Sequence, residues 1–175
     1  MNLFSVDFCL LLISVILSII LLVYLARNKK KSQLHSIFIV DLLLTLIISI
    51  GVLVQSVCYN IFEINPMIFE NFIYIGTCFL PVSLFFTGLI FANTKIGFKK
   101  WYLLLFIIPL LSLLILWTND FHHLFYKYYS SNINECVYGS YIIVHHLYSY
   151  ILMFIGMLYL LRYSIKNSGF FSKQS

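Results

Sequence analysis

Hydrophobic residues gather in five long runs separated by short polar connections. A helix of roughly 20 residues rises ~1.5 Å per residue and therefore crosses the ~30 Å hydrocarbon core of a bilayer. The pattern predicts an all-α fold, a polytopic transmembrane helix bundle with five spans. The predicted spans cover residues 3–25, 37–58, 72–92, 101–117 and 141–161.

Lysine and arginine alternate between the connections. Four follow the first run, none the second, three the third and only Lys127 the fourth, and three more lie in the tail at 162–175. Because basic residues concentrate on the cytoplasmic side, this distribution predicts an outside N-terminus and a cytoplasmic tail. With 62% hydrophobic and 10% charged residues, the chain has no room for a separate soluble domain, so we expect one membrane domain over 1–175.

The formal net charge of +5 comes from these basic loop rims, which meet anionic lipid, and nucleic acid is not an expected partner. The first run has no basic residue before it and a basic stretch after it, so we expect a retained helix rather than a cleaved signal peptide. The four cysteines lack the spacing of a metal site. Cys58 and Cys136 would both face outside, where they either pair or stay free thiols.

Four of the five histidines lie near the outside ends of the fourth and fifth runs: His122, His123, His145 and His146. Neutral imidazole binds zinc, copper and iron. Adjacent helical residues point about 100° apart, so the last two histidines would not face one ion together, and only one of them would face the bundle. A metal site would need one histidine of each pair and a carboxylate; otherwise the histidines are hydrogen-bonded residues of an interfacial belt. The available carboxylates are Glu63, Glu70, Asp120 and Glu135.

Asp41 lies about one turn inside the second run, near the basic connection. Its side chain is expected either to reach toward Lys29–Lys31 or to form a buried switch or proton site. Pro81 and Pro109 lie inside the third and fourth runs, where proline kinks a helix because it has no N–H donor.

Aromatic residues near the ends of the runs are expected to anchor the helices at the membrane interface. They include Tyr59, Tyr74, Trp101, Trp117, Phe125, Tyr126 and Tyr141. The connection at 118–140 holds aromatic residues, amides and histidines instead of glycine and serine, so it is expected to fold back onto the bundle. No catalytic triad, phosphate loop or HExxH zinc motif occurs, so we expect neither enzymatic activity nor a cofactor.

Two motifs resemble a known family. Pro109, followed by Thr118-Asn119 and then His122-His123, resembles the pattern at the outer end of helix four in the N-terminal seven-transmembrane sensor region of bacterial histidine kinases. Entering the fifth run, the chain matches the family pattern Gly-Pro-x-Phe-Trp-x-His-x-x-Tyr-Ser-Tyr at Gly139, His145, Tyr148, Ser149 and Tyr150. Ser140 and Ile143 replace the family's Pro and Trp. Tyr74, Gly76 and Pro81 resemble a third pattern, in the third run.

The resemblance implies a multi-pass sensor in a bacterial cell membrane that binds an unidentified extracellular or membrane ligand and acts in two-component signalling. It implies helix movement about Pro81 and Pro109. Because the family continues into further helices and a kinase module, the chain is expected to be truncated after helix five and to lack a phosphoacceptor and an ATP site. Its output would then pass to further helices or to a partner kinase. The implied sensing residues are Asn119, His122, His123, His145, Tyr148 and Tyr150.

An alternative is a stand-alone small membrane protein that binds a metal or haem through the outer histidines, namely His122, His123, His145 and His146. A transporter fragment is a third interpretation, which the lack of paired charges within the runs disfavours.

Overall fold

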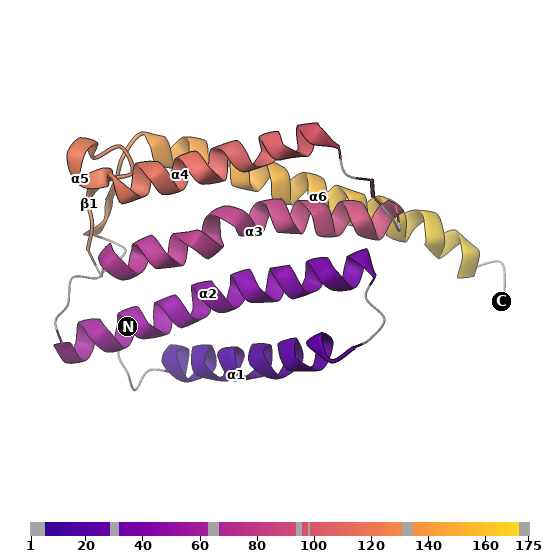
Figure 1. Cartoon of the computed structure of the whole chain (residues 1–175), viewed down its shortest axis with the longest axis horizontal. Helices are drawn as coiled ribbons and strands as arrows, with labels where there is room; N and C mark the ends of the chain where they lie inside the picture. The colour runs from indigo at the N-terminus through magenta and orange to yellow at the C-terminus, as the bar shows by residue number, and fades with distance from the viewer. Residues whose placement is uncertain are drawn as a thin grey trace.

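A computed structural model describes residues 6–28, 32–62, 67–93, 96–97, 99–130 and 135–171. These residues form a mostly helical chain (Figure 1). Its elements are α1 (Val6–Ala26), α2 (Gln33–Phe62), α3 (Met67–Asn93), the 3₁₀-helix η1 (Lys100–Phe106), α4 (Ile107–Trp117), α5 (Asn119–His122), β1 (Tyr126–Tyr128), β2 (Val137–Tyr138) and α6 (Tyr141–Phe171).

Five helical segments of the described chain are long and apolar enough to cross a membrane: α1, α2, α3, η1 with α4, and α6. The predicted spans fall inside these segments, although residues 3–5 of the first span lie outside the described residues. Helix α6 continues to Phe171, beyond the end of the predicted fifth span at 161, so the first part of the predicted tail is helical. Helical hydrogen bonding continues into polar sequence that the hydrophobic runs do not include.

The prediction of an all-α chain needs one correction. β1 and β2 pair antiparallel beside α5. The N-termini of α3 and α6 and the C-termini of α2 and α4 lie at the same end of the bundle as this strand pair (Figure 1). We call this end the β end and the other the opposite end.

Helix α3 is the central helix. It contacts α2, α4, η1 and α6, whereas α1 packs beside α2 at the edge of the bundle (Figure 1). Many residues of α3 are buried, while large apolar side chains of α1, α4 and α6 point outward. Outward-facing apolar side chains are what a helix presents to lipid.

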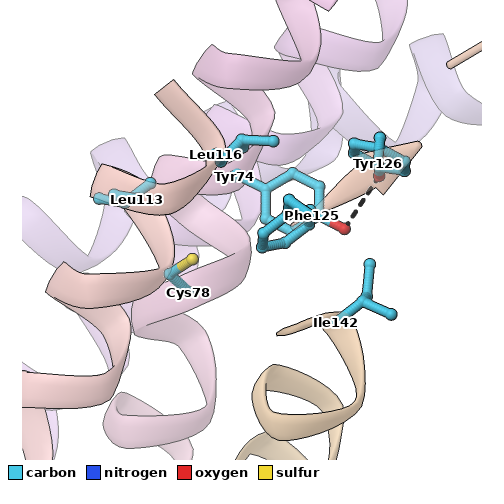
Figure 2. Packing of buried hydrophobic residues seen from close by; sticks show 7 residues of the cluster. All are labelled: Tyr74, Cys78, Leu113, Leu116, Phe125, Tyr126 and Ile142. Atoms are coloured by element: carbon cyan, nitrogen blue, oxygen red, sulfur yellow. Dashed lines mark hydrogen bonds between the residues drawn. The ribbon is translucent and has the colours of Figure 1, made fainter. Parts of the chain in front are cut away.

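The described parts of the connection at 118–140, residues 118–130 and 135–140, fold back onto the bundle, as predicted. Phe125 has no exposed surface and lies among side chains of α3, α4, β1 and α6 (Figure 2). The cluster comprises Tyr74, Cys78, Leu113, Leu116, Phe125, Tyr126 and Ile142. The prediction that Tyr74, Phe125 and Tyr126 anchor at the interface is therefore wrong, because they fill the end of the bundle core.

Toward the opposite end, a second cluster joins α3, η1 and α6. It is formed by Val82, Phe85, Leu89, Tyr102 and Leu152. Pro109 is buried near the start of α4, directly after η1, where a missing N–H is tolerated. Pro81 is buried inside α3, which continues through it.

Asp41 is buried at the interface of α2 and α3. Its Oδ2 accepts a 2.6 Å hydrogen bond from the Thr87 hydroxyl. The side chain is therefore buried, while Lys29–Lys31, toward which it was expected to reach, lie outside the described residues. The carboxylate thus links α2 to the central helix α3.

The backbones of α3 and α6 meet at Gly88 and Gly156. A Cβ atom on Gly88 would overlap the Gly156 carbonyl, and one on Gly156 would lie 3.0 Å from the Leu84 carbonyl oxygen. Small residues allow such close approach between membrane helices, where packing replaces the hydrophobic effect as the source of association.

We predict that Gly88→Ala lowers the unfolding free energy by about 1–3 kcal/mol, because the added methyl group must push α6 away. Detergent-induced unfolding of the purified chain, followed by circular dichroism, measures the change. Gly97→Ala is the matched control, since no described atom lies within 4 Å of the point where its Cβ would lie. Equal unfolding midpoints for the two variants would contradict the close packing.

Candidate functional site

Asn119 shapes the turn at the β end. Its side-chain oxygen accepts hydrogen bonds from the backbone N–H groups of Phe125 (2.9 Å) and Tyr126 (3.0 Å). Its side-chain nitrogen donates to the Tyr126 carbonyl at 2.9 Å. Asn119 is buried, so this amide satisfies backbone groups that would otherwise lose water without gaining a partner. This turn places the side chains of Phe125 and Tyr126 in the buried core.

His122 and His123 have different surroundings. The Leu124 N–H donates to Nδ1 of His122 at 3.1 Å, and Nε2 of His122 lies 3.0 Å from the Thr118 hydroxyl. Since Nδ1 accepts, Nε2 carries the proton and donates to Thr118. His123 is exposed and has a left-handed backbone (φ 52°), which is uncommon for a residue other than glycine. Its N–H closes the turn on the Asn119 carbonyl.

The Glu70 carboxylate joins three elements. It accepts hydrogen bonds from the hydroxyl groups of Tyr126 (3.1 Å) and Tyr129 (2.8 Å), and the Gln55 amide lies 3.4 Å away. The Gln55 amide also donates to the Tyr129 hydroxyl at 2.8 Å, and the hydroxyls of Tyr74 and Tyr126 lie 3.2 Å apart (Figure 2). We call Gln55, Glu70, Tyr74, Tyr126 and Tyr129 the Glu70 network. It links the strand region to α2 and α3.

Two phenols of the Glu70 network outside the helices, those of Tyr126 and Tyr129, have raised pKa values. Burial raises the pKa of Tyr126, and the nearby Tyr74 and Glu70 raise it further. Burial is also the main reason for the raised pKa of Tyr129, followed by the charge of Glu70. Both hydroxyls therefore remain protonated donors to the carboxylate at neutral pH.

A cavity of about 200 Å³ lies beside the Glu70 network. It is lined by Met67, Asn119, Asp120, His123, Tyr126, Lys127, Tyr128 and Tyr129. Tyr126 and Tyr129 belong to both the cavity wall and the network, so a molecule in the cavity would contact two residues whose hydroxyls bind Glu70. We call it the β-end cavity.

His145 lies inside the bundle, away from this cavity wall. It is 97% buried, its Nδ1 lies 3.1 Å from the Ser112 hydroxyl, and its ring packs on Tyr74 and Phe125. His146 has its Nδ1 3.2 Å from the Ile142 carbonyl and stacks on Tyr150. The prediction that only one of the adjacent histidines faces the bundle is confirmed.

The structure brings only part of the predicted set together. Asn119 and His123 line the β-end cavity, and His122 lies in the same turn. Tyr148 lies farther along α6, where its hydroxyl donates to the Leu105 carbonyl, and Tyr150 is largely exposed. Gln55, Tyr126 and Tyr129 were not predicted as site residues, and Glu70 only as a possible metal ligand. Glu70 could have been found as an acidic residue in the first turn of an apolar helix.

Within the described residues, no group of three or more His, Cys, Asp or Glu side chains is placed to hold a metal ion. Glu63, one of the carboxylates considered, lies outside them. Cys58 and Cys136 are not joined by a disulfide bond, and the Cys136 thiol donates to the Ser130 carbonyl at 3.1 Å.

Residues 10–175 match the family described as the N-terminal 7TM region of histidine kinase. The chain belongs to this family. A search of curated proteins and a search of solved structures found no match. The family match confirms the resemblance seen in the motifs and covers nearly the whole chain, so these 175 residues form a membrane sensor region and hold no kinase domain.

We predict that Asn119→Ala lowers the unfolding free energy by about 1–3 kcal/mol or more, because it leaves buried backbone groups of Phe125 and Tyr126 unpaired. Detergent unfolding and proteolysis of the segment at 119–130 measure the effect. Asp120→Asn, at the exposed neighbouring position, is the control and should leave both unchanged. An equally stable Asn119→Ala chain would show that the turn holds without this amide.

A second prediction concerns alkaline pH. Since the folded chain raises the pKa values of Tyr126 and Tyr129, their stabilising contribution is complete below the unfolded value of about 10 and is lost as the pH rises above it. Tyrosinate absorbance in a pH titration should show these phenols ionising only as the β end opens. Tyr126→Phe combined with Tyr129→Phe should reduce the pH dependence of unfolding, whereas the exposed Tyr128→Phe should not. If the unfolding free energy falls equally with pH in the native chain and in the double variant, the pH dependence does not come from these two phenols.

Proposed function

We propose that the chain is the signal-input domain of a bacterial histidine-kinase system, with the β end outside the cell and the opposite end in the cytoplasm. The distribution of charge supports this orientation. Among the described residues, the strand pair at the β end carries Lys127. At the opposite end, Arg27 follows α1, Lys99 and Lys100 lie at the start of η1, and Arg162 and Lys166 lie in the C-terminal part of α6. Basic residues are retained on the cytoplasmic side of bacterial membranes. In this proposal, residues 1–175 form one membrane domain.

The observation that carries the proposed input site is the Glu70 network beside the β-end cavity. One carboxylate holds Tyr126 and Tyr129 of the folded-back segment against α3, and Gln55 extends the connection to α2. A small solute in the cavity that competes for these hydroxyls would loosen the segment from both helices. Such a solute would shift the equilibrium between the attached and the loosened segment only by the difference in its affinity for these two arrangements.

The central helix offers the route to the other end. α3 carries Glu70 in its first turn, and near its other end Thr87 binds Asp41 of α2. At the opposite end, the Gln33 side chain both donates to the Ile96 carbonyl (2.9 Å) and accepts from its N–H (2.8 Å). A shift of α3 against α2 would thus reach the connection at the cytoplasmic face. The output would pass from there to further helices or to a kinase.

The orientation is tested with single cysteines placed at Tyr128 and at Arg27. A membrane-impermeant maleimide should label the first in intact cells and the second only after the membrane is permeabilised. The native Cys78 is buried, and a parent chain with Cys9, Cys58 and Cys136 replaced by serine provides the background. The reverse labelling pattern would exclude the proposed orientation.

Transmission is tested by hydrogen exchange of the whole chain in nanodiscs. Glu70→Gln should raise exchange of the amides near Gln33 and Ile96 by about fivefold or more, the lower end of usual coupling between sites. Asp7→Asn is the matched control, because it removes an exposed carboxylate at the same end outside the network. A change confined to the β end would show that the network is only a local structural element.

A further inference from the structure

We propose that a groove between α2, α3 and η1 binds a phospholipid with an anionic head group. The groove has a volume of about 550 Å³ and lies at the opposite end of the bundle, away from the β-end cavity. It is lined by Ser32, Gln33, Ser36, Ile37, Val40, Phe86, Ile90, Ile96, Gly97, Tyr102 and Phe106. Its walls and its mouth have different chemistry.

The deeper part of the groove is apolar. On α2 the lining positions 33, 36, 37 and 40 recur at helical spacing and therefore share one face. From Gln33 to Val40 this face extends for roughly 10 Å, compared with roughly 15 Å for the hydrocarbon of one leaflet. Phe86 and Ile90 of α3 form the facing wall. These dimensions suit the upper part of an acyl chain.

The mouth of the groove is polar. Ser32, Ser36 and Gly97 lie where α2 begins and where the connection after α3 passes. Gln33 fixes the edge of this mouth, because its amide binds both backbone groups of Ile96. A polar mouth above an apolar wall matches the division between the head group and the tail of a lipid.

Positive charge lies beside the mouth. Lys99 lines an adjoining hollow of about 390 Å³ that shares Ile96, Gly97 and Tyr102 with the groove, and Lys100 follows at the start of η1. No acidic side chain lines either hollow within the described residues. A phosphate head group would thus meet basic residues, whereas a zwitterionic head group would gain little from them.

Native mass spectrometry of the detergent-solubilised chain tests this proposal, with phosphatidylglycerol and phosphatidylcholine of identical acyl chains as probes. Phosphatidylglycerol should bind more tightly. The double variant Lys99→Gln with Lys100→Gln should weaken phosphatidylglycerol binding by about fivefold per lysine, or about 25-fold in all. The affinity for phosphatidylcholine should stay unchanged. Lys127→Gln, at the other end of the bundle, is the charge control. Equal affinity for the two lipids in the native chain would overturn the proposal.

Val40→Trp tests whether the lipid occupies the groove itself, because the larger side chain fills the apolar part. It should reduce phosphatidylglycerol binding, whereas Ile143→Trp, on an exposed apolar surface of α6, should not. Ser36→Trp, at the mouth, blocks the groove in a second way if the first variant unfolds. Unchanged binding in a folded groove variant would place the lipid elsewhere and refute the site.

Discussion

The close packing of α3 against its neighbours is the constraint on which the bundle depends. α3 contacts α2, α4, η1 and α6, and Gly88 meets the backbone of Gly156 in α6. In a lipid environment, apolar side chains gain little by moving from lipid to protein, so close contact and interhelical hydrogen bonds must hold the helices together. The Thr87 bond to Asp41 supplies such a hydrogen bond between α2 and α3. The same helix carries Glu70, so the geometry of the proposed input site depends on how α3 is packed.

The hydrophobic runs predicted the five long helices because length and apolar character alone decide whether a helix can cross a membrane. They did not predict where the helices end. α6 continues past Leu161, since polar residues form helical hydrogen bonds as well as apolar ones do. The aromatic residues were harder to interpret. From the sequence, Phe125 near the end of a run could belong either to an interfacial belt or to the core. The turn formed by Asn119 places it in the core.

The candidate site was predicted in part. The clustered histidines lie at the same end of the bundle as the candidate site, but their separate surroundings follow from details that the sequence does not display. His122 is held by Thr118 and Leu124, whereas His145 lies within the bundle beside Ser112. The Glu70 network joins residues 56 and 59 positions apart, Glu70 to Tyr126 and Glu70 to Tyr129. No local spacing reveals such pairs, because they depend on the path by which the segment returns to the bundle.

The length of α6 has a mechanical consequence. Its 31 residues extend for roughly 46 Å, whereas the hydrocarbon core measures roughly 30 Å. The helix contains no proline, so no residue within it lacks the N–H group that the hydrogen-bond ladder needs. α6 is therefore longer than a hydrocarbon core is thick, and a helix of this length can act as a stiff lever whose far arm is its C-terminal part. A small tilt where His145 packs on Phe125 would become a larger sideways displacement at the far arm, without any change in the helix itself.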